Sequence, residues 1–322
     1  MCTAITYKPK NFYFGRTLDA AESYPAEVVI SPRGYIFKRH KSAFSARYAI
    51  AGAAVVSDGY PLYFDGMNER GLCMAGLNFI GNAKYFPACG DKLNLAQFEL
   101  IPYILGNCAT LGDAEYELGR INITAQPFSP DMPPAQLHWL VADRTGAVTV
   151  ECTVNGINIF KNQIGVLTNN PPFSYHISNL SNYMHLTAMP PQNNLLPEVS
   201  LAPFGAGQGA VGLPGDMSSA SRFVRAAFLC GNAPEGMEGE GALSQFFSLL
   251  AGVSVPKGAC RTQSGDFYTQ YACCCAADEG AYYFTTSSCR ALCSVRFSEG
   301  AVAGGGISRY AMPRGEKIIN LN

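Results

Sequence analysis

The chain has 322 residues, of which 48% are hydrophobic and 15% charged, and its formal net charge is −1. A chain of this length and apolar content buries a sizeable core, and its composition excludes an intrinsically disordered protein. A near-neutral charge without a basic run also argues against binding to nucleic acid or to an anionic membrane surface.

The beginning of the sequence and its apolar runs give expectations about location. The opening segment MCTAITYKPK has no basic stretch followed by an apolar core, so no secretory signal is recognisable. The longest apolar runs, such as residues 49–56, fall far short of the roughly 20 residues of a membrane-spanning helix. We therefore expect a soluble, cytoplasmic protein whose twelve cysteines are reduced thiols.

Hydrophobic patterning predicts strands at the start of the chain and helices after them. Short apolar or alternating runs predict strands, the first two joined by a turn at 8–10, in residues 2–7, 11–16, 27–31, 47–56 and 72–79. Helical spacing follows in residues 93–105 and 113–121, with Asp113 as the cap of the second helix. A proline-rich loop is expected at 127–134, and strands again at 137–142, 148–153, 156–160 and 164–167.

The second half predicts a loop, two helices and a final set of strands. Residues up to about 214 are rich in Asn, Pro and Gly, and their early part has helical character. Ser218 or Ser219 then caps a helix that ends near Cys230, and a second helix covers 242–253. The last predicted strands are 269–276, 281–286 and 294–297. This order predicts an α+β fold of two sheets packed face to face, in one domain spanning 1–322.

Cys2 is the first residue with chemical potential. Removal of the initiator Met1, which a small second residue allows, would leave a free α-amine beside the Cys2 thiol. Their ordinary pKa values are about 7.7–8.0 and 8.5, so one residue could supply both a general base and a nucleophile. Cys2 also fits the ordinary position of a buried strand residue, and its place in the sequence does not decide between the two.

Arg16 and Asp19 are candidate partners of Cys2. They lie in GRTLD at 15–19, after a strand that could pair with the first. Such a hairpin would bring the guanidinium near the thiol, where it favours thiolate, and the carboxylate near the α-amine, which it could hold by hydrogen bonding. A surface salt bridge at a strand end is the alternative reading of this pair.

A series of further motifs is spread in order over nearly the whole chain. They are MCT at 1–3, FGRTLD at 14–19, DGMNERGL at 65–72, AGLNF at 75–79, LHW at 137–139, GVLTNNP at 165–171, GLPGD at 212–216, SRF at 221–223 and TQY at 269–271. Together they resemble the choloylglycine hydrolase family, which contains bile salt hydrolases and penicillin V acylases. Any one of these motifs alone would be weak, but several in series make chance agreement very unlikely.

The resemblance implies an αββα sandwich of two antiparallel sheets flanked by helices, the fold of N-terminal-nucleophile hydrolases. It makes Cys2 nucleophile and base, with Arg16 and Asp19 beside it and Arg222 completing the polar site. The main-chain N–H of Asn78 and the side-chain amide of Asn169 would stabilise the oxyanion, each donor contributing about 2.7–4 kcal/mol by analogy. It implies neither a cofactor nor a metal.

The resemblance also suggests a substrate. Bile salt hydrolases resemble this chain in carrying Asn at position 78, where many penicillin V acylases carry Tyr, so a glycine- or taurine-conjugated bile salt is favoured. A steroid needs a broad apolar pocket, and residues on segments that resemble the family's substrate loops would form its wall, although each also fits core packing: Leu18, Val56, Tyr60 and Phe128. The alternatives are an acylase on penicillin V or N-acyl homoserine lactones, and a catalytically silent protein that binds amphiphiles. A homotetramer is expected by resemblance alone.

Other patterns in the sequence give weaker indications of function. The run Gly207–Gly212 fits G-x-G-x-x-G but follows no clear strand and precedes Pro214, so we interpret it as a loop. The cysteines at 273–275 would alternate faces in a strand and cannot share a metal. The histidines, His138 expected in the core among them, show no metal-binding spacing: His40, His138, His176 and His185.

Overall fold

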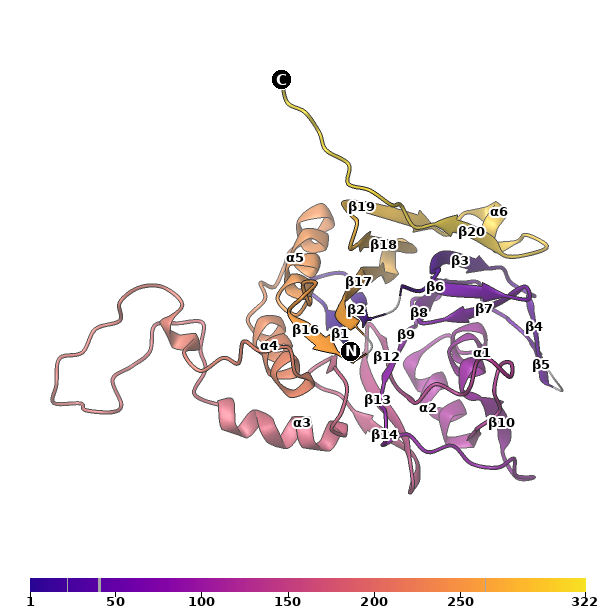
Figure 1. Ribbon diagram of the computed structural model, residues 1–322, viewed down its shortest axis with the longest axis horizontal. Helices are drawn as coiled ribbons and strands as arrows, with labels where there is room; N and C mark the ends of the chain where they lie inside the picture. Colours follow the sequence, from indigo (N-terminus) through magenta and orange to yellow (C-terminus); the bar gives the residue numbers. More distant parts are fainter. Residues whose placement is uncertain (22, 40–41, 264) are drawn as a thin grey trace.

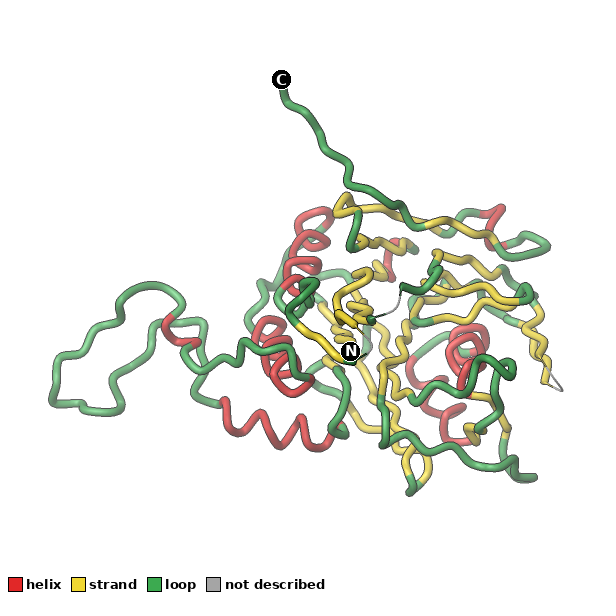
Figure 2. The backbone as a smooth tube through the Cα atoms, viewed as in Figure 1, coloured by secondary structure: helices red, strands yellow, loops and turns green. Residues whose placement is uncertain are grey.

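The computed structural model describes residues 1–322 except Glu22, His40, Lys41 and Ser264. Two large sheets pack against each other, and helices cover the outer face of each (Figures 1 and 2). The predicted α+β fold, an αββα sandwich of antiparallel sheets flanked by helices, is therefore confirmed. The prediction of one domain over 1–322 stays a prediction.

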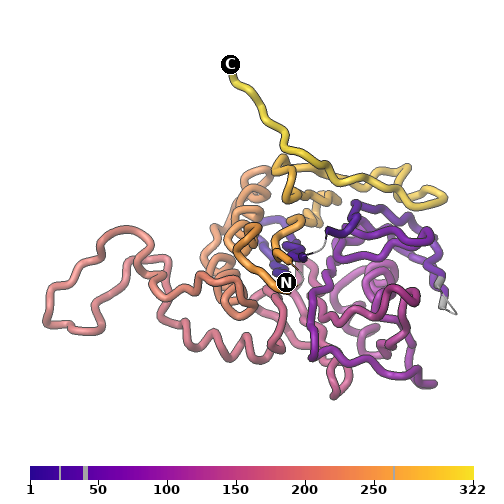
Figure 3. Tube along the Cα trace, in the orientation of Figure 1, coloured from indigo at the N-terminus to yellow at the C-terminus, as the bar shows by residue number. Residues whose placement is uncertain are grey.

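The seven-stranded sheet combines the two ends of the chain, so indigo and orange segments lie side by side (Figures 1 and 3). Its order along the sheet is β15 (Val166–Leu167), β1 (Cys2–Tyr7), β2 (Tyr13–Ala20), β17 (Gly265–Ala276), β18 (Ala281–Thr286) and β19 (Cys289–Arg296), with β16 (Cys260–Thr262) paired to β17. Every residue of β2 is buried. Such a strand has one face on the other sheet and one on helices, which removes the usual alternation of polar and apolar residues.

The nine-stranded sheet is built from the first half of the chain and one late strand. Its order is β14 (Gly156–Lys161), β13 (Gly146–Thr153), β12 (Leu137–Asp143), β9 (Cys73–Asn78), β8 (Asp65–Asn68), β6 (Ile50–Ser57), β3 (Glu27–Ser31) and β20 (Ser308–Ala311), with β7 (Tyr60–Tyr63) paired to β6. Two small ribbons accompany it, β4 (Ile36–Arg39) with β5 (Ser42–Ser45), and β10 (Leu93–Ala96) with β11 (Ile121–Thr124).

The helices divide between the two outer faces. Contacts place α1 (Leu100–Asn107) and α2 (Leu111–Arg120) on the nine-stranded sheet, and α4 (Ser219–Gly231) and α5 (Gly239–Ala251) on the seven-stranded sheet. Next to α4 lies α3 (Phe173–Asn179), and α6 (Glu299–Val302) contacts β3. Short 3₁₀ turns are η1 (Gln97–Glu99), η2 (Leu180–Tyr183), η3 (Gln208–Ala210) and η4 (Ala277–Glu279). Within the described residues, no helix combines the length and apolar character that a membrane crossing requires.

Alternating residues of the nine-stranded sheet contribute side chains to two hydrophobic cores. In β6, Ala51 and Ala53 pack between the sheets, whereas Ile50 and Ala54 belong to the core under α1 and α2. This is the expected period of two for a strand buried on both faces. The two cores therefore share the same strands.

Most predicted strands of the sheets are confirmed, with shifted ends. The predicted strand 11–16 begins later and runs on, so Arg16 and Asp19 lie inside β2 rather than after it. Ser218 caps α4 through its side chain, which accepts a hydrogen bond from the Ser221 N–H, as predicted. The G-x-G-x-x-G run at 207–212 is a loop containing η3.

The predicted helix at 93–105 was wrong in its first part. Residues Leu93–Ala96 form β10, which pairs in parallel with β11. The Asn94 side chain bonds the main chain of Cys89 and accepts from the Asn122 amide at 2.8 Å, so contacts across the ribbon override the helical spacing. The helix begins only at Leu100.

The predicted cap of the next helix was also wrong. Thr110 is the N-cap of α2, and Asp113 is its third residue. Thr110 Oγ1 accepts from the Asp113 N–H at 3.2 Å, and the Asp113 carboxylate accepts from the Thr110 N–H at 3.0 Å. The two residues form a capping box, which a Ser/Thr followed three positions later by an acid signals.

A close approach of β2 to β17 gives a test of the sandwich. A Cβ on Gly15 would lie 1.9 Å from the carbonyl oxygen of Cys273, whereas a Cβ on Gly119, in α2, meets nothing within 4 Å. We expect Gly15→Ala to lower the free energy of unfolding by about 1–3 kcal/mol or more, because the central strands must move apart. Gly119→Ala should be neutral or raise it by up to about 1 kcal/mol. Urea denaturation of both variants checks this, and equal stabilities would contradict it.

Candidate active site

Strand pairing assembles the predicted residues at one end of the seven-stranded sheet. Cys2 lies opposite Leu18 in the pairing of β1 with β2, and Ala4 lies opposite Arg16. Residues two apart on a strand share a face, so Arg16, Leu18 and Cys2 point to the same side of the sheet. Asn169 follows β15, which pairs with β1 on its other edge. The expected hairpin that brings Arg16 and Asp19 to Cys2 is present.

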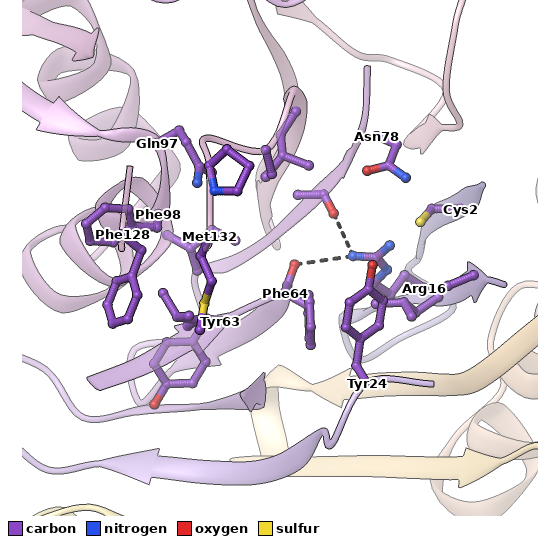
Figure 4. A pocket seen from close by; sticks show the side chains of 18 of the residues that line it. Cys2, Arg16, Tyr24, Tyr63, Phe64, Asn78, Gln97, Phe98, Phe128 and Met132 are labelled. Carbon is purple, nitrogen blue, oxygen red and sulfur yellow. Dashed lines mark hydrogen bonds between the residues drawn. The ribbon is translucent and has the colours of Figure 1, made fainter. Parts of the chain in front are cut away.

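Arg16 is 1% exposed and is held by main-chain carbonyls. Its Nη1 donates to Gly76 O at 2.6 Å and to Phe64 O at 3.3 Å, as the dashed lines in Figure 4 show. Burial by itself lowers the pKa of Arg16, but the nearby Cys2, Tyr271 and Asp65 outweigh burial and raise it. The side chain is therefore a fixed positive charge beside the Cys2 thiol, as the sequence predicted.

Asn169 connects Cys2 to α4 and to β9. Its Oδ1 accepts from the main-chain nitrogen of Cys2 at 2.8 Å and from Arg222 Nη2 at 2.8 Å. These two donors fix the orientation of the amide, because only an oxygen can accept both. Its Nδ2 then faces the carbonyl of Asn78, to which it donates at 2.8 Å. Both residues predicted to stabilise an oxyanion are thus in direct contact.

Arg222 reaches the site from α4. The guanidinium is fully buried, and its Nη1 donates to Cys2 O at 2.6 Å and to Thr3 Oγ1 at 2.5 Å. Burial lowers the pKa of Arg222, while Asp19 and Cys2 oppose this effect. The arginine therefore ties the first strand to α4 and to Asn169.

Two threonine hydroxyls hold the side chain of Asp19. Its carboxylate accepts from the hydroxyls of Thr269 at 2.6 Å and Thr17 at 3.3 Å. The main-chain nitrogen of Cys2 is anchored by Asn169 Oδ1, while Met1 pairs with the main chain of Asp19. While Met1 is attached, the nitrogen of Cys2 is a peptide nitrogen with a single proton, so a contact between the Asp19 carboxylate and the α-amine stays a prediction.

The main chain of Asn78 faces the cavity. Asn78 lies opposite Leu137 in the pairing of β9 with β12. The N–H of Leu137 donates to the Tyr85 hydroxyl at 2.9 Å, so this is a non-hydrogen-bonded pair of the ladder. The N–H and C=O of Asn78 both point away from β12, and the C=O meets Asn169. The N–H is therefore directed to the same side as Asn169.

A cavity leads from these residues between the two sheets and η1. Cys2, Arg16, Asp19 and Asn78 form its polar end, and the rest of its wall is mainly apolar (Figure 4). The lining includes two of the predicted wall residues, Leu18 and Phe128. The rest of the lining consists of residues that were not predicted to form its apolar wall, namely Ala20, Tyr24, Leu62, Tyr63, Phe64, Gly76, Gln97, Phe98, Ile101, Met132, Pro133, Ala135 and Leu137.

Two predicted wall residues do not line the cavity. Tyr60 is buried one layer behind, with its ring against Phe98 and Phe128 at centroid distances of 5.7 Å. Val56 is partly buried against the same core. Both lie on or beside the β6–β7 hairpin and support the wall from the second core.

Asp65 is a buried site residue that sequence reasoning missed. Its carboxylate lies 4.0 Å from Arg16 Nε and accepts from the hydroxyls of Tyr271 at 2.5 Å and Tyr282 at 2.6 Å. Cys273 Sγ lies 3.4 Å from the same carboxylate. Asp65 opens the DGMNERGL motif, but a carboxylate at a strand start gives no sequence signal of which arginine it will neutralise.

Two buried histidines and a glutamate support Asn169 from behind. His176 Nε2 lies 2.8 Å from Asn169 O, and its ring stacks on Phe223. His138 lies between Glu151 and the carbonyl of Thr168, at 3.2 and 3.0 Å, which confirms its expected place in the core. Burial lowers the pKa of His176, so the ring is neutral and donates one proton to the carbonyl. These contacts position the loop after β15.

The described residues contain no group of three or more His, Cys, Asp or Glu side chains that could hold a metal ion. Cys273, Cys274 and Cys275 lie in β17, and burial raises the pKa of each thiol well above its ordinary value. His40 lies outside the described residues.

Comparison with known proteins identifies the family. A family model described as linear amide C–N hydrolases, choloylglycine hydrolase family, matches residues 2–303. The chain belongs to the choloylglycine hydrolase family. The resemblance read from the motifs is confirmed, and the protein is a hydrolase of linear amide C–N bonds with the N-terminal-nucleophile fold.

Individual relatives of this choloylglycine hydrolase are similar over most of its length. The bile salt hydrolase/transferase of Lactiplantibacillus plantarum is 44% identical over 275 residues, 84% of this chain and 85% of the relative. The conjugated bile acid hydrolase of Lactobacillus gasseri is 37% identical over 278 residues, 84% of this chain and 88% of the relative.

Two solved structures share the fold of this choloylglycine hydrolase. A variant of the conjugated bile acid hydrolase from Clostridium perfringens matches with a TM-score of 0.93 and 32% identity over the whole of both chains. The penicillin V acylase from Agrobacterium tumefaciens has a TM-score of 0.77 at 22% identity, covering 97% of this chain and 92% of the acylase. The second match shows a common fold alone.

The buried carboxylate beneath Arg16 generates a prediction. We expect Asp65→Asn to lower the free energy of unfolding by about 3 kcal/mol, because Arg16 loses a buried counter-charge. Glu238→Gln is the control, since Glu238 pairs with Lys10 at the surface and should matter by less than about 1 kcal/mol. Urea denaturation followed through the buried Trp139 measures both, and an Asp65→Asn protein as stable as the control would refute the assignment.

Proposed function

We propose that this protein hydrolyses the amide bond of glycine- or taurine-conjugated bile salts, with Cys2 as nucleophile and general base. The observation that carries the proposal is the division of the cavity. A thiol, a guanidinium and a main-chain N–H lie at one end, and the rest is lined by aromatic and aliphatic side chains. An amphiphile with an amide beside a broad apolar body fits such a division.

The reaction proceeds by acyl transfer in two stages. After removal of Met1, the nitrogen of Cys2 is an amine held by Asn169 Oδ1, and it takes the thiol proton. The thiolate attacks the amide carbonyl, a tetrahedral intermediate forms, and the C–N bond breaks as the α-ammonium gives its proton to the departing nitrogen. Water, deprotonated by the same amine, then hydrolyses the thioester and releases the bile acid.

Five residues have supporting roles in this proposal. The Asn78 N–H and the second N–H of Asn169 Nδ2 stabilise the oxyanion, for which two fixed neutral donors suit a water-poor site. Arg16 favours the thiolate by its charge. Arg222 fixes Asn169 and the carbonyl of Cys2 and is a positioning residue, whereas Asp19 shapes the cavity wall and anchors β17 through Thr269.

Relatives support the bile-salt substrate over the alternatives. The relatives at 44% and 37% identity are named as bile salt and conjugated bile acid hydrolases. The acylase of penicillin V is more distant, at 22%. An acylase on penicillin V or N-acyl homoserine lactones and a silent amphiphile-binding protein remain the competing functions, and they differ in what the following experiment would show.

Purified protein, with its mass measured to establish loss of Met1, is incubated with glycocholate, taurocholate and penicillin V under reducing conditions. We expect release of glycine and taurine, slow cleavage of penicillin V, and a loss of at least about 1,000-fold in rate for Cys2→Ala, because the variant lacks the nucleophile. Cys89→Ala is the matched control, since this partly exposed cysteine lies outside the cavity lining.

Each other outcome selects a different function. Rapid cleavage of penicillin V with inert bile salts would make this protein an acylase. Binding of bile salts without turnover, in protein that has lost Met1, would make it a silent binder.

We infer a homo-oligomer from the long segment between η2 and α4. This segment extends away from the sandwich as a loop (Figures 1 and 2), and it carries apolar side chains in solvent. Phe204 is 99% exposed and Leu195 is 82% exposed, and Met184, Met189, Leu196, Val199, Leu201 and Val211 are exposed with them. Many exposed apolar side chains on one extended segment are typical of an interface, and a tetramer of identical chains is the assembly we propose.

Charge on the extended loop tests the assembly. We expect the double variant Leu195→Asp with Phe204→Asp to shift the protein to smaller species in size-exclusion chromatography with light scattering, because two carboxylates would be buried without partners. Tyr116→Asp, on the exposed side of α2, is the control. A wild-type mass of one chain, or an unchanged mass in the double variant, would contradict the inference.

A further inference from the structure

One polar side chain, Gln97, lies at the apolar end of the cavity. None of the proposed reaction steps gives it a hydrogen-bond partner. Gln97 lies on η1, between β10 and α1, and is only 7% exposed. It lines the cavity with Phe98, Ile101 and Phe128, on the wall across from Cys2 and Arg16 (Figure 4). An amide is an unusual choice for such a wall, because its donors and acceptor must be satisfied when the cavity is filled.

Within the described part of the chain, the Gln97 amide makes no hydrogen bond. The neighbouring Tyr60 hydroxyl also lacks a partner among the described residues, but Tyr60 lies behind the wall and does not line the cavity. Two other neighbouring polar groups are paired. The Glu99 carboxylate accepts from the Ala96 N–H at 2.8 Å, and the Tyr63 hydroxyl meets Ser31 Oγ at 2.8 Å. Gln97 is therefore the buried polar group at this end of the cavity whose hydrogen-bonding capacity stays open.

The local structure holds Gln97 in place. The Glu99 carboxylate accepts from the Ala96 N–H at the start of η1, and α1 continues directly from η1. Phe98 packs edge-on against Tyr60 and Phe128, at centroid distances of 5.7 and 5.2 Å. Because η1 is fixed on both sides, it holds Gln97 at a constant place in the cavity wall. A residue that discriminates between substrates requires such a fixed position.

We propose that Gln97 is a specificity-determining residue that hydrogen-bonds a hydroxyl group on the acyl part of the substrate, at the end farthest from the scissile amide. The proposal rests on the function proposed above and refines its substrate class. A primary amide donates and accepts, as does a hydroxyl, so the pair forms in either direction. An acyl group without a polar atom at its far end, such as a plain fatty chain or an aryloxyacetyl group, would bury the Gln97 amide without a hydrogen-bond partner. Such a substrate is therefore disfavoured.

A matched pair of substrates tests this contact. Glycolithocholate carries its single hydroxyl on the ring farthest from the amide, and the glycine conjugate of 5β-cholanic acid lacks it. We expect wild-type kcat/KM to favour the hydroxylated conjugate by about tenfold or more. Gln97→Met, of similar length but without hydrogen bonds, should bring this ratio close to one, mainly by slowing the hydroxylated substrate.

Gln163→Met is the control, because Gln163 is an exposed residue outside the cavity lining and should preserve the wild-type ratio. A ratio near one in the wild type, or the same ratio in wild type and Gln97→Met, would overturn the proposal. Circular dichroism establishes that each variant is folded.

A second readout separates this proposal from the proposed function. If wild type cleaves neither conjugate, the proposed function fails, and binding of the free acids lithocholate and 5β-cholanate is measured by titration calorimetry. Preference for lithocholate in wild type and its loss in Gln97→Met would still support Gln97 as the hydroxyl contact. Equal affinities in wild type, or a preference that survives in Gln97→Met, would overturn it.

Discussion

The hydrogen bond from the main-chain nitrogen of Cys2 to Oδ1 of Asn169 is the contact on which the rest of the site depends. It joins the first strand to the loop after β15, and Arg222 from α4 donates to the same oxygen. Because that oxygen is occupied twice, the amide cannot rotate, and its nitrogen must face Asn78 on the other sheet. One side-chain orientation therefore sets the relation between Cys2, Asn169 and Asn78 across both sheets.

Several charged side chains of the site are buried away from water. Burying a charge costs free energy unless an opposite charge or hydrogen bonds compensate it. Arg16 is compensated by three carbonyls and by Asp65, and Arg222 by the carbonyls of Cys2 and Met217 and the amide of Asn169. Tyr271 and Tyr282 complete the shell around Asp65. The interior of the sandwich thus combines an apolar core with a polar network that lies almost entirely at its cavity end.

The predictable part of the structure follows from strong local patterns. Alternation and capping signals located the long strands and α4, and the motif series identified the family and the cluster around Cys2. Short strands such as β7, β8 and β10 were missed, because four residues carry too little periodicity and their pairing partners are remote in sequence. Asp65 and Gln97 were missed for a related reason. Their importance comes from what tertiary packing places beside them, and no spacing in the sequence records it.

Met1 occupies a position with consequences for how the enzyme is switched on. Its nitrogen and carbonyl pair with the carbonyl and N–H of Asp19, so it prolongs β1 by one residue along the edge of the cavity. Cleavage of that residue would do more than create an amine. It would also expose the main-chain donor and acceptor of Asp19 next to the thiol, where the amide of an incoming substrate could take over the vacated strand pairing. A single proteolytic event would then create the base and open the docking edge together, so the unprocessed chain would be a true zymogen.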